Sequence, residues 1–243
     1  MRVSGLVSVA LILLVFATAC GQQRASMASW DLFGADGIIG GQDVLAGEPI
    51  ANTTAFLYDV RRGSFCSASI IDSRWLLTAA HCVADHEPRG FLVAMRGSYS
   101  DLLAKRVKSS DLRRVVEIQV HPRYALAMKQ VNDVIETAKR EGRDLTVADL
   151  DKVRDWGDIA ILKLDQAVPL GKSAARFLPE TEILRVGQTV TIAGYGQTGT
   201  GEAAATGQLK KVDVQISDEN FSPSEILVDN RGKGACHGDS GGP

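Results

Sequence analysis

Short runs rich in β-branched and aromatic residues recur along most of the chain, separated by glycines and turn sequences. From residue 38 onwards these runs occupy residues 54–60, 67–71, 75–78, 91–95, 115–120, 159–164, 189–193 and 209–216. Runs of this length, bounded by turns such as Arg62-Gly63, are typical of strands in antiparallel sandwiches and barrels. The pattern therefore predicts an all-β fold.

Residues 125–156 depart from that pattern. In a charged background, apolar residues recur there at helical spacing, at Val131, Val134, Ile135 and Ala138. A capping sequence at residues 146–149 predicts a second short helix that carries Leu150 and Val153. We therefore expect a helical insertion at about residues 125–156 of the β protein.

The N-terminus has the layout of a signal peptide over residues 1–19, with Arg2 followed by an apolar run of 11 residues at positions 6–16. A membrane-spanning helix needs roughly 20 apolar residues, so this run predicts a cleaved leader rather than a permanent anchor. Cleavage after Ala19 fits ordinary signal peptidase. Alternatively, Cys20 followed by Gly21 resembles a bacterial lipobox, in which Cys20 would carry a lipid that tethers the protein to a membrane.

Both alternatives predict an exported protein, either secreted or periplasmic, and the lipobox reading favours a bacterial source. Residues 20–37 are short, polar and rich in small residues, which is typical of a propeptide or tether rather than of a folded element. The folded body is expected to begin at Ile38.

The composition is that of an ordinary globular protein, with 45% hydrophobic and 23% charged residues. Lysine and arginine number 27 against 29 acidic residues, so the net charge is −2. Nucleic-acid binding needs a basic surface, and this balance argues against such a partner.

The cysteines bear on both compartment and metal binding. Cys66 and Cys82 flank a predicted hairpin, and an exported protein can form disulfides, so these two are a candidate pair. A zinc site built from His81, Cys82 and His86 lacks a fourth ligand and a second clustered motif. We therefore expect neither a metal nor an organic cofactor.

The stretch Gly238-Asp239-Ser240-Gly241-Gly242 has the character of a nucleophile loop, because glycines allow tight turns that aim amide groups at a developing oxyanion. A serine also needs a base to take its proton. The related elbow of α/β-hydrolases requires a histidine after the serine and alternating strands and helices, and neither follows here. The base must therefore come from upstream. His81 is the candidate, because it follows an apolar strand that ends in small residues, and these would let the imidazole face a cleft.

At this point the chain resembles the trypsin/chymotrypsin family of serine proteases. The matching stretches follow the family's order over nearly all of residues 38–243: Ile38-Ile39-Gly40-Gly41, Phe65-Cys66 with Ser69-Ile70-Ile71, Trp75-Leu76-Leu77-Thr78-Ala79-Ala80-His81-Cys82, His121-Pro122-Arg123-Tyr124, Asp158-Ile159-Ala160-Ile161-Leu162-Lys163-Leu164, Gly194-Tyr195-Gly196-Gln197-Thr198 and Gly238 to Pro243. The resemblance implies two packed antiparallel β-barrels with the active site between them. Residues 38–170 would form the first barrel, including the insertion, and residues 171–243 would belong to the second.

Two aspartates compete for the third position of the triad that the resemblance implies. Asp133 lies 12 residues after His121, about the family's usual distance, whereas Asp158 lies 37 residues after it. Asp133 leads into a polar helical stretch, but Asp158 leads directly into a buried-strand pattern. We therefore select Asp158, since the helical insertion explains the longer spacing, and Asp133 is the alternative.

The resemblance also implies the remaining roles. Ser240 would attack the scissile carbonyl, His81 would accept its proton, and Asp158 would orient the imidazole. The N–H groups of Gly238 and Ser240 would form the oxyanion hole. Asp239 would pair with the α-amino group of Ile38 after cleavage of a zymogen.

The residues expected to govern activation and substrate specificity differ from those of the best-known family members. Gly37 precedes Ile38 where many relatives carry arginine or lysine, so either a separate activating protease or an unusual self-cleavage is expected. The residue six before the nucleophile is Gly234 rather than an aspartate, which predicts a small or apolar residue before the cleaved bond. Ala235 agrees with that preference, and His237 is a further candidate for contact with the substrate.

The expected function is that of a secreted serine endopeptidase acting on proteins or peptides. The family continues beyond Pro243 with strands that close the second barrel and with a disulfide partner for Cys236. The chain is therefore expected to be truncated and poorly active by itself. A catalytically silent homologue that acts as a binding module, and an esterase with the same triad, are the alternatives.

Overall fold

The computed structural model describes residues 38–144, 146, 149, 153, 156–197, 207–229 and 232–243. The predicted signal peptide, the Cys20 lipid anchor and the tether lie outside these residues. Most of the second predicted insertion helix also lies outside them. Among the residues that are described, no helix is long and apolar enough to cross a bilayer.

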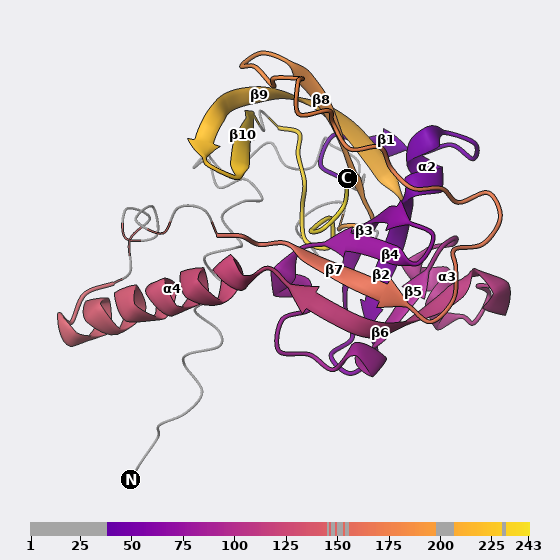
Figure 1. Ribbon diagram of the computed structural model, residues 1–243, viewed down its shortest axis with the longest axis horizontal. Coiled ribbons are helices and arrows are strands. Elements are labelled where there is room, and N and C mark those ends of the chain that lie inside the picture. Colours follow the sequence, from indigo (N-terminus) through magenta and orange to yellow (C-terminus); the bar gives the residue numbers. More distant parts are fainter. Residues whose placement is uncertain are drawn as a thin grey trace, which may run out of the picture.

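Six antiparallel strands close into a barrel in the order β2-β3-β4-β7-β6-β5 (Figure 1). They are β2 (Thr54–Asp59), β3 (Ser64–Asp72), β4 (Trp75–Thr78), β5 (Phe91–Ala94), β6 (Leu112–Val120) and β7 (Ala160–Leu164). Alternate side chains of β7 point inwards, as the period of a strand requires. The core contains Leu57, Ile70, Leu76, Phe91, Val93, Met95, Val115, Leu162 and Leu164.

A second, open sheet of four strands lies beside the barrel. Strand β9 (Lys210–Ser222) is its centre and pairs with β1 (Gln42–Asp43), β8 (Thr189–Gly194) and β10 (Glu225–Asp229). The all-β prediction is confirmed, and the barrel plus second sheet are consistent with the two-barrel fold. Because β1 pairs with β9, the first residues of the body contribute to the second sheet rather than to the first barrel.

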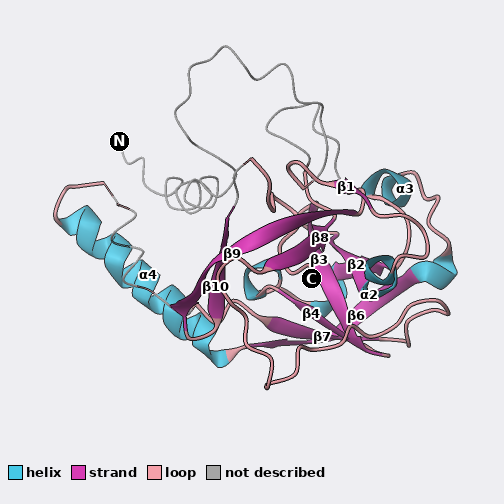
Figure 2. Ribbon diagram, turned by 90° about the horizontal axis from the view of Figure 1, so that it is seen from above, coloured by secondary structure: helices cyan, strands magenta, loops and turns pink. Residues whose placement is uncertain are grey.

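The insertion contains the long helix α4 (Pro122–Arg140), which projects away from the barrel in both ribbon views (Figure 1, Figure 2). The helix starts three residues before the predicted insertion, because Pro122 suits a first helical position and the His121 side chain accepts a hydrogen bond from the Arg123 N–H. The His121 N–H donates to the Ile159 carbonyl at 2.9 Å, which closes the base of the insertion.

Gly157 lets the chain return against the start of α4. Its φ angle is 56°, and an added Cβ would lie 2.6 Å from the Cβ of Arg123. A side chain at this position would push the helix away from the strand that follows.

The other helices of the described residues are short. They are α2 (Pro49–Thr53), α3 (Tyr99–Leu103) and the 3₁₀ turns η3 (Ala80–Cys82), η4 (Pro88–Gly90) and η5 (Ser109–Asp111). Helix α3 begins with a capping box in which Ser98 and Asp101 satisfy each other's backbone N–H groups. Of these elements, η3 bears directly on the site because it carries His81.

Candidate active site

His81 and Asp158 are joined at two points, although 77 residues separate them in sequence. The His81 Nδ1 lies 2.6 Å from Asp158 Oδ2, and the His81 backbone N–H donates to Asp158 Oδ1 at 2.8 Å. The carboxylate therefore favours the tautomer that carries its proton on Nδ1. This tautomer leaves Nε2 with a lone pair, which is what a general base requires.

Local structure explains why the imidazole is accessible. The barrel strand β4 ends at Thr78, and the small buried residues Ala79 and Ala80 lead into η3. The His81 side chain remains 35% exposed and that of Asp158 29% exposed. The pair thus lies at the surface of the barrel rather than in its core.

Two opposing influences act on the pKa of Asp158. Burial is the largest and raises the pKa, but the hydrogen bonds and charge of His81 lower it, and the net shift is downwards. The carboxylate is therefore ionised at neutral pH and can stabilise a protonated imidazole.

The competing aspartate lies elsewhere. Asp133 is on the exposed face of α4, where its carboxylate pairs with the Lys129 ammonium at 3.0 Å. Both of these side chains are at least two-thirds exposed, and they form an ordinary helical ion pair. The structure thus brings Asp158, and not Asp133, to His81.

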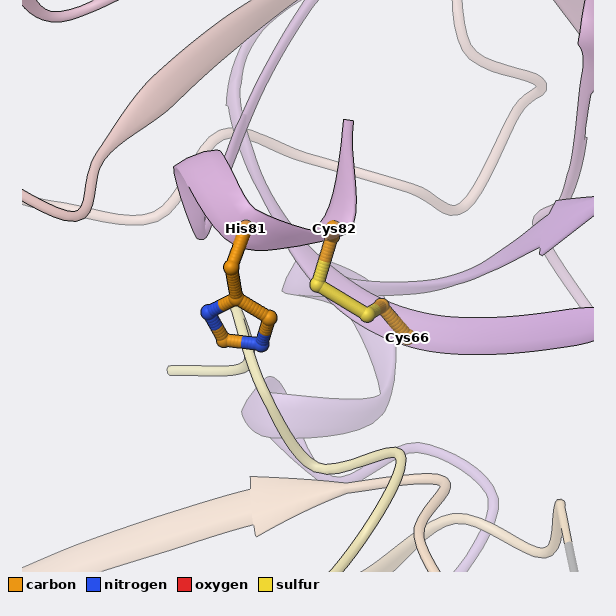
Figure 3. A group of neighbouring side chains, drawn as sticks. All are labelled: Cys66, His81 and Cys82. Carbon is orange, nitrogen blue, oxygen red and sulfur yellow. A yellow bond between two sulfur atoms is a disulfide. The ribbon is translucent and has the colours of Figure 1, made fainter. Parts of the chain in front are cut away.

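The predicted disulfide between Cys66 and Cys82 is present, and it lies beside the imidazole of His81 (Figure 3). Ligand atoms of the three residues lie within 4.8 Å of one another. Both sulfur atoms are committed to the disulfide, so this group offers no thiolate to a metal ion. None of the described cysteines is a free thiol.

The second histidine–aspartate pair differs from the first. His86 Nδ1 lies 2.9 Å from Asp59 Oδ2, and both side chains are nearly buried. The imidazole stacks on Phe91, with ring centroids 5.5 Å apart. These contacts indicate a packing role for His86.

The Ser240 segment packs against the same part of the barrel. The Ser67 N–H donates to the Ser240 carbonyl at 2.9 Å, and that carbonyl oxygen lies 3.9 Å from the sulfur of Cys82. The Ser240 carbonyl is therefore next to the disulfide that adjoins His81, and in the view of Figure 3 the pale yellow C-terminal trace runs behind the imidazole. Among the described residues, the Ser240 hydroxyl has no hydrogen-bond partner.

The backbone of Gly238 is held in a conformation that only glycine adopts easily. Its φ angle is 96°, and an added Cβ would lie 2.1 Å from the ring of Phe65. Its carbonyl accepts a hydrogen bond from the Ser67 hydroxyl at 2.9 Å. Within the described part of the chain, the N–H groups of Gly238 and Ser240 donate to no protein acceptor.

Asp239 is buried beside the Ser240 loop, with only 6% of its surface exposed. Its two carboxylate oxygens accept hydrogen bonds from the N–H groups of Gly196 at 2.7 Å and Cys236 at 2.8 Å. Burial raises the pKa of Asp239 to about 6, and these hydrogen bonds offset only part of the effect. A cation brought to this carboxylate would therefore be strongly favoured.

Ile38 is fully buried, and its side chain packs on Val212 and Val214 of β9. Its neighbour Ile39 forms an isolated bridge with Gly234, whose N–H donates to the Ile39 carbonyl at 3.0 Å. Gly234 is thus buried against the start of the body, whereas Ala235 and His237 are exposed. These three residues do not contribute to the pocket at His81.

A pocket of about 190 Å³ opens beside the His81–Asp158 pair. Its other walls are Tyr124 and Met128 of α4, Trp156 at the end of the insertion and Glu225 at the start of β10. Sequence reasoning missed these four residues. The helical period of the insertion was the one available signal, and it pointed to α4 without showing which face meets the site.

Comparison with known proteins agrees with this arrangement. The family model described as Trypsin matches residues 38–243, and the chain therefore belongs to the trypsin family. The predicted resemblance is confirmed. Among its relatives, Venom serine protease 34 of Apis mellifera is 27% identical over 193 residues, which are 74% of this chain and 42% of the relative.

Two further relatives have a similar identity. Vitamin K-dependent protein C of Oryctolagus cuniculus is 29% identical over 210 residues, covering 77% of this chain and 39% of the relative. Brachyurin of Leptuca pugilator is 26% identical over 220 residues, covering 85% of this chain and 80% of the relative. The chain thus spans about two fifths of the first two relatives. These relatives are all animal proteins, and they do not support the bacterial source that the lipobox resemblance favoured.

Proposed function

We propose that the protein is a serine endopeptidase that hydrolyses peptide bonds through Ser240, His81 and Asp158. The observation that carries the proposal is the two-point contact between Asp158 and His81, beside the disulfide on which the Ser240 segment packs. Membership of the trypsin family supports the same reaction.

In this mechanism the Ser240 hydroxyl attacks the scissile carbonyl while His81 Nε2 accepts its proton, and His81 then protonates the leaving amine. Asp158 holds the tautomer and stabilises the imidazolium that forms. The N–H groups of Gly238 and Ser240 bind the oxyanion, and one such donor typically contributes about 3 kcal/mol to the transition state. Water then hydrolyses the acyl-enzyme. The Ser240 hydroxyl makes no hydrogen bond to His81 or to another described residue, and catalytic hydrogen bonds often form only when substrate is bound.

Activation follows from the surroundings of Asp239. Cleavage before Ile38 by an activating protease creates an α-amino group, and its pairing with the Asp239 carboxylate would offset the burial that raises the pKa of this group. The loop that carries Gly238 and Ser240 would be ordered by this ion pair. Export of the precursor is supported by the disulfide and by the leader-like N-terminus.

The uncharged residues Gly234 and Ala235 support a small or apolar residue immediately before the cleaved bond, with His237 as a further contact. A library of peptides that differ only at that position tests this preference. A maximum at arginine or lysine there would contradict it.

Labelling with a fluorophosphonate probe tests the central proposal. The activated full-length protein should be labelled, Ser240→Ala should abolish labelling, and the exposed-serine control Ser73→Ala should not. Labelling that persists in Ser240→Ala, or no labelling of the activated protein, would contradict the proposed nucleophile and favour a silent homologue. Turnover of casein and of simple esters then separates a peptidase from an esterase, because an esterase would hydrolyse only the esters.

A further inference from the structure

The pocket beside His81 is built largely by the insertion and by a distant strand of the second sheet. Tyr124 and Met128 lie on α4, whereas Glu225 begins β10. Because His81 and Asp158 form part of the same wall, a side chain bound here belongs to a residue close to the cleaved bond. The pocket is separate from Gly234 and Ala235, so it selects a different substrate residue.

The walls of the pocket suit a long aliphatic chain. The aromatic residues Tyr124 and Trp156 and the thioether-bearing Met128 are among its lining residues. Aromatic faces also attract cations, and the methylene chains of lysine and arginine pack well on such surfaces. An extended side chain with a cationic tip therefore matches both features.

Among the described residues that line the pocket, the carboxylates of Asp158 and Glu225 carry negative charge, and none is a lysine or arginine. Asp158 is committed to His81. One oxygen of Glu225, Oε2, accepts a hydrogen bond from the Ser222 hydroxyl at 2.9 Å, and Oε1 accepts none from the described residues.

Burial is the main cause that raises the pKa of Tyr124 to about 12, and the charges of Asp158 and Asp85 make smaller contributions. The phenol is therefore neutral at ordinary pH, and Tyr124 offers an uncharged aromatic side chain to the pocket.

We propose that this pocket binds a lysine or arginine side chain of the polypeptide substrate, with Glu225 as the residue that selects its charge. The inference rests on the proposed peptidase function and adds a second specificity determinant to it. Glu225 acts here as a binding residue, and the insertion supplies the apolar walls.

Peptide pairs that differ by one residue test the proposal. Lysine is compared with the uncharged norleucine and with glutamate at each position within three residues of the cleaved bond, in the activated full-length protein. At one position, kcat/KM should be about fivefold higher for lysine than for norleucine, the effect of one partly exposed ion pair. No preference for lysine at any of these positions would overturn the proposal.

Variants then assign the preference to this pocket. Glu225→Gln should bring the lysine-to-norleucine ratio to about 1, because the amide has no charge. Glu182→Gln removes the same charge from an exposed position outside the pocket and should leave the ratio unchanged. Met128→Lys puts a cation into the pocket and should favour glutamate over lysine. An unchanged ratio in both Glu225→Gln and Met128→Lys would contradict the assignment.

Binding without turnover separates this proposal from the peptidase function. Fluorescently labelled lysine and norleucine peptides are titrated into Ser240→Ala, with and without Glu225→Gln, and anisotropy is measured. Tighter binding of the lysine peptide that depends on Glu225 supports the pocket even if no peptide is hydrolysed. If Ser240→Ala binds the two peptides equally while the protein with Ser240 hydrolyses them, the pocket proposal alone would be overturned.

Discussion

The Asp158 carboxylate contacts His81 through both of its oxygens, one on the ring Nδ1 and one on the backbone N–H. This arrangement fixes the position of the histidine as well as its tautomer, because the ring cannot turn without breaking the contact at Nδ1. The insertion returns at Gly157, immediately before Asp158, so the same turn that closes the insertion also aims the carboxylate.

Replacing Asp158 with asparagine should remove most of the activity while preserving the fold. The amide still fills the space but favours the wrong tautomer, and kcat should fall on the order of 10⁴-fold. Hydrolysis of a good peptide substrate by the activated protein measures the effect. Asp133→Asn is the matched control, since its carboxylate lies on the exposed face of α4, and it should change kcat less than about twofold. Equal losses in the two variants would contradict the assignment of Asp158.

Loss of the Cys66–Cys82 disulfide should destabilise the barrel. The two cysteines are 16 residues apart, and a loop of that length corresponds to about 3 kcal/mol of unfolding free energy. Urea unfolding of Cys66→Ala/Cys82→Ala measures the change. A loss below about 1 kcal/mol would show that the barrel strands alone hold this loop.

The stability of the uncleaved precursor should fall as Asp239 loses its proton. Its pKa of about 6 in the folded state lies above the ordinary value of 3.8, so the folded state binds the extra proton between these pH values. Unfolding free energy should therefore decrease from about pH 4 to pH 7 by about 3 kcal/mol relative to Asp239→Asn. Urea unfolding of both proteins across this range gives the difference. A difference that stays constant with pH would mean that Asp239 titrates normally.

Gly238→Ala should damage both folding and catalysis. Its Cβ would collide with the ring of Phe65, and the positive φ angle adds strain. The control is Gly142→Ala, which has a φ angle of 66° but no atom within 4 Å of the added Cβ. The control should cost about 1 kcal/mol of stability, and Gly238→Ala should cost at least twice as much. Melting temperatures and kcat measured for both variants test this, and equal effects would show that the loop moves away from Phe65 at little cost.

Several elements could be predicted because their cause is local. The predicted strand at residues 75–78 coincides with β4, since an apolar run between turns has few alternatives. The apolar pattern after Asp158 also predicts a strand, and this prediction favours Asp158 over Asp133 as the triad aspartate. By contrast, β10 was missed because its five residues become a strand only by pairing with β9.

The sequence by itself determined the all-β class, the helical insertion, the disulfide and the residues proposed for the triad, because these depend on local periodicity and on short motifs. The tertiary structure decided which side chains meet. It set Asp158 against His81, buried Asp239 next to Ser240 and brought Glu225 into the same pocket as Tyr124, about 100 residues away in sequence. Such contacts arise from the closure of the barrel and the packing of the second sheet against it, and no local pattern encodes them.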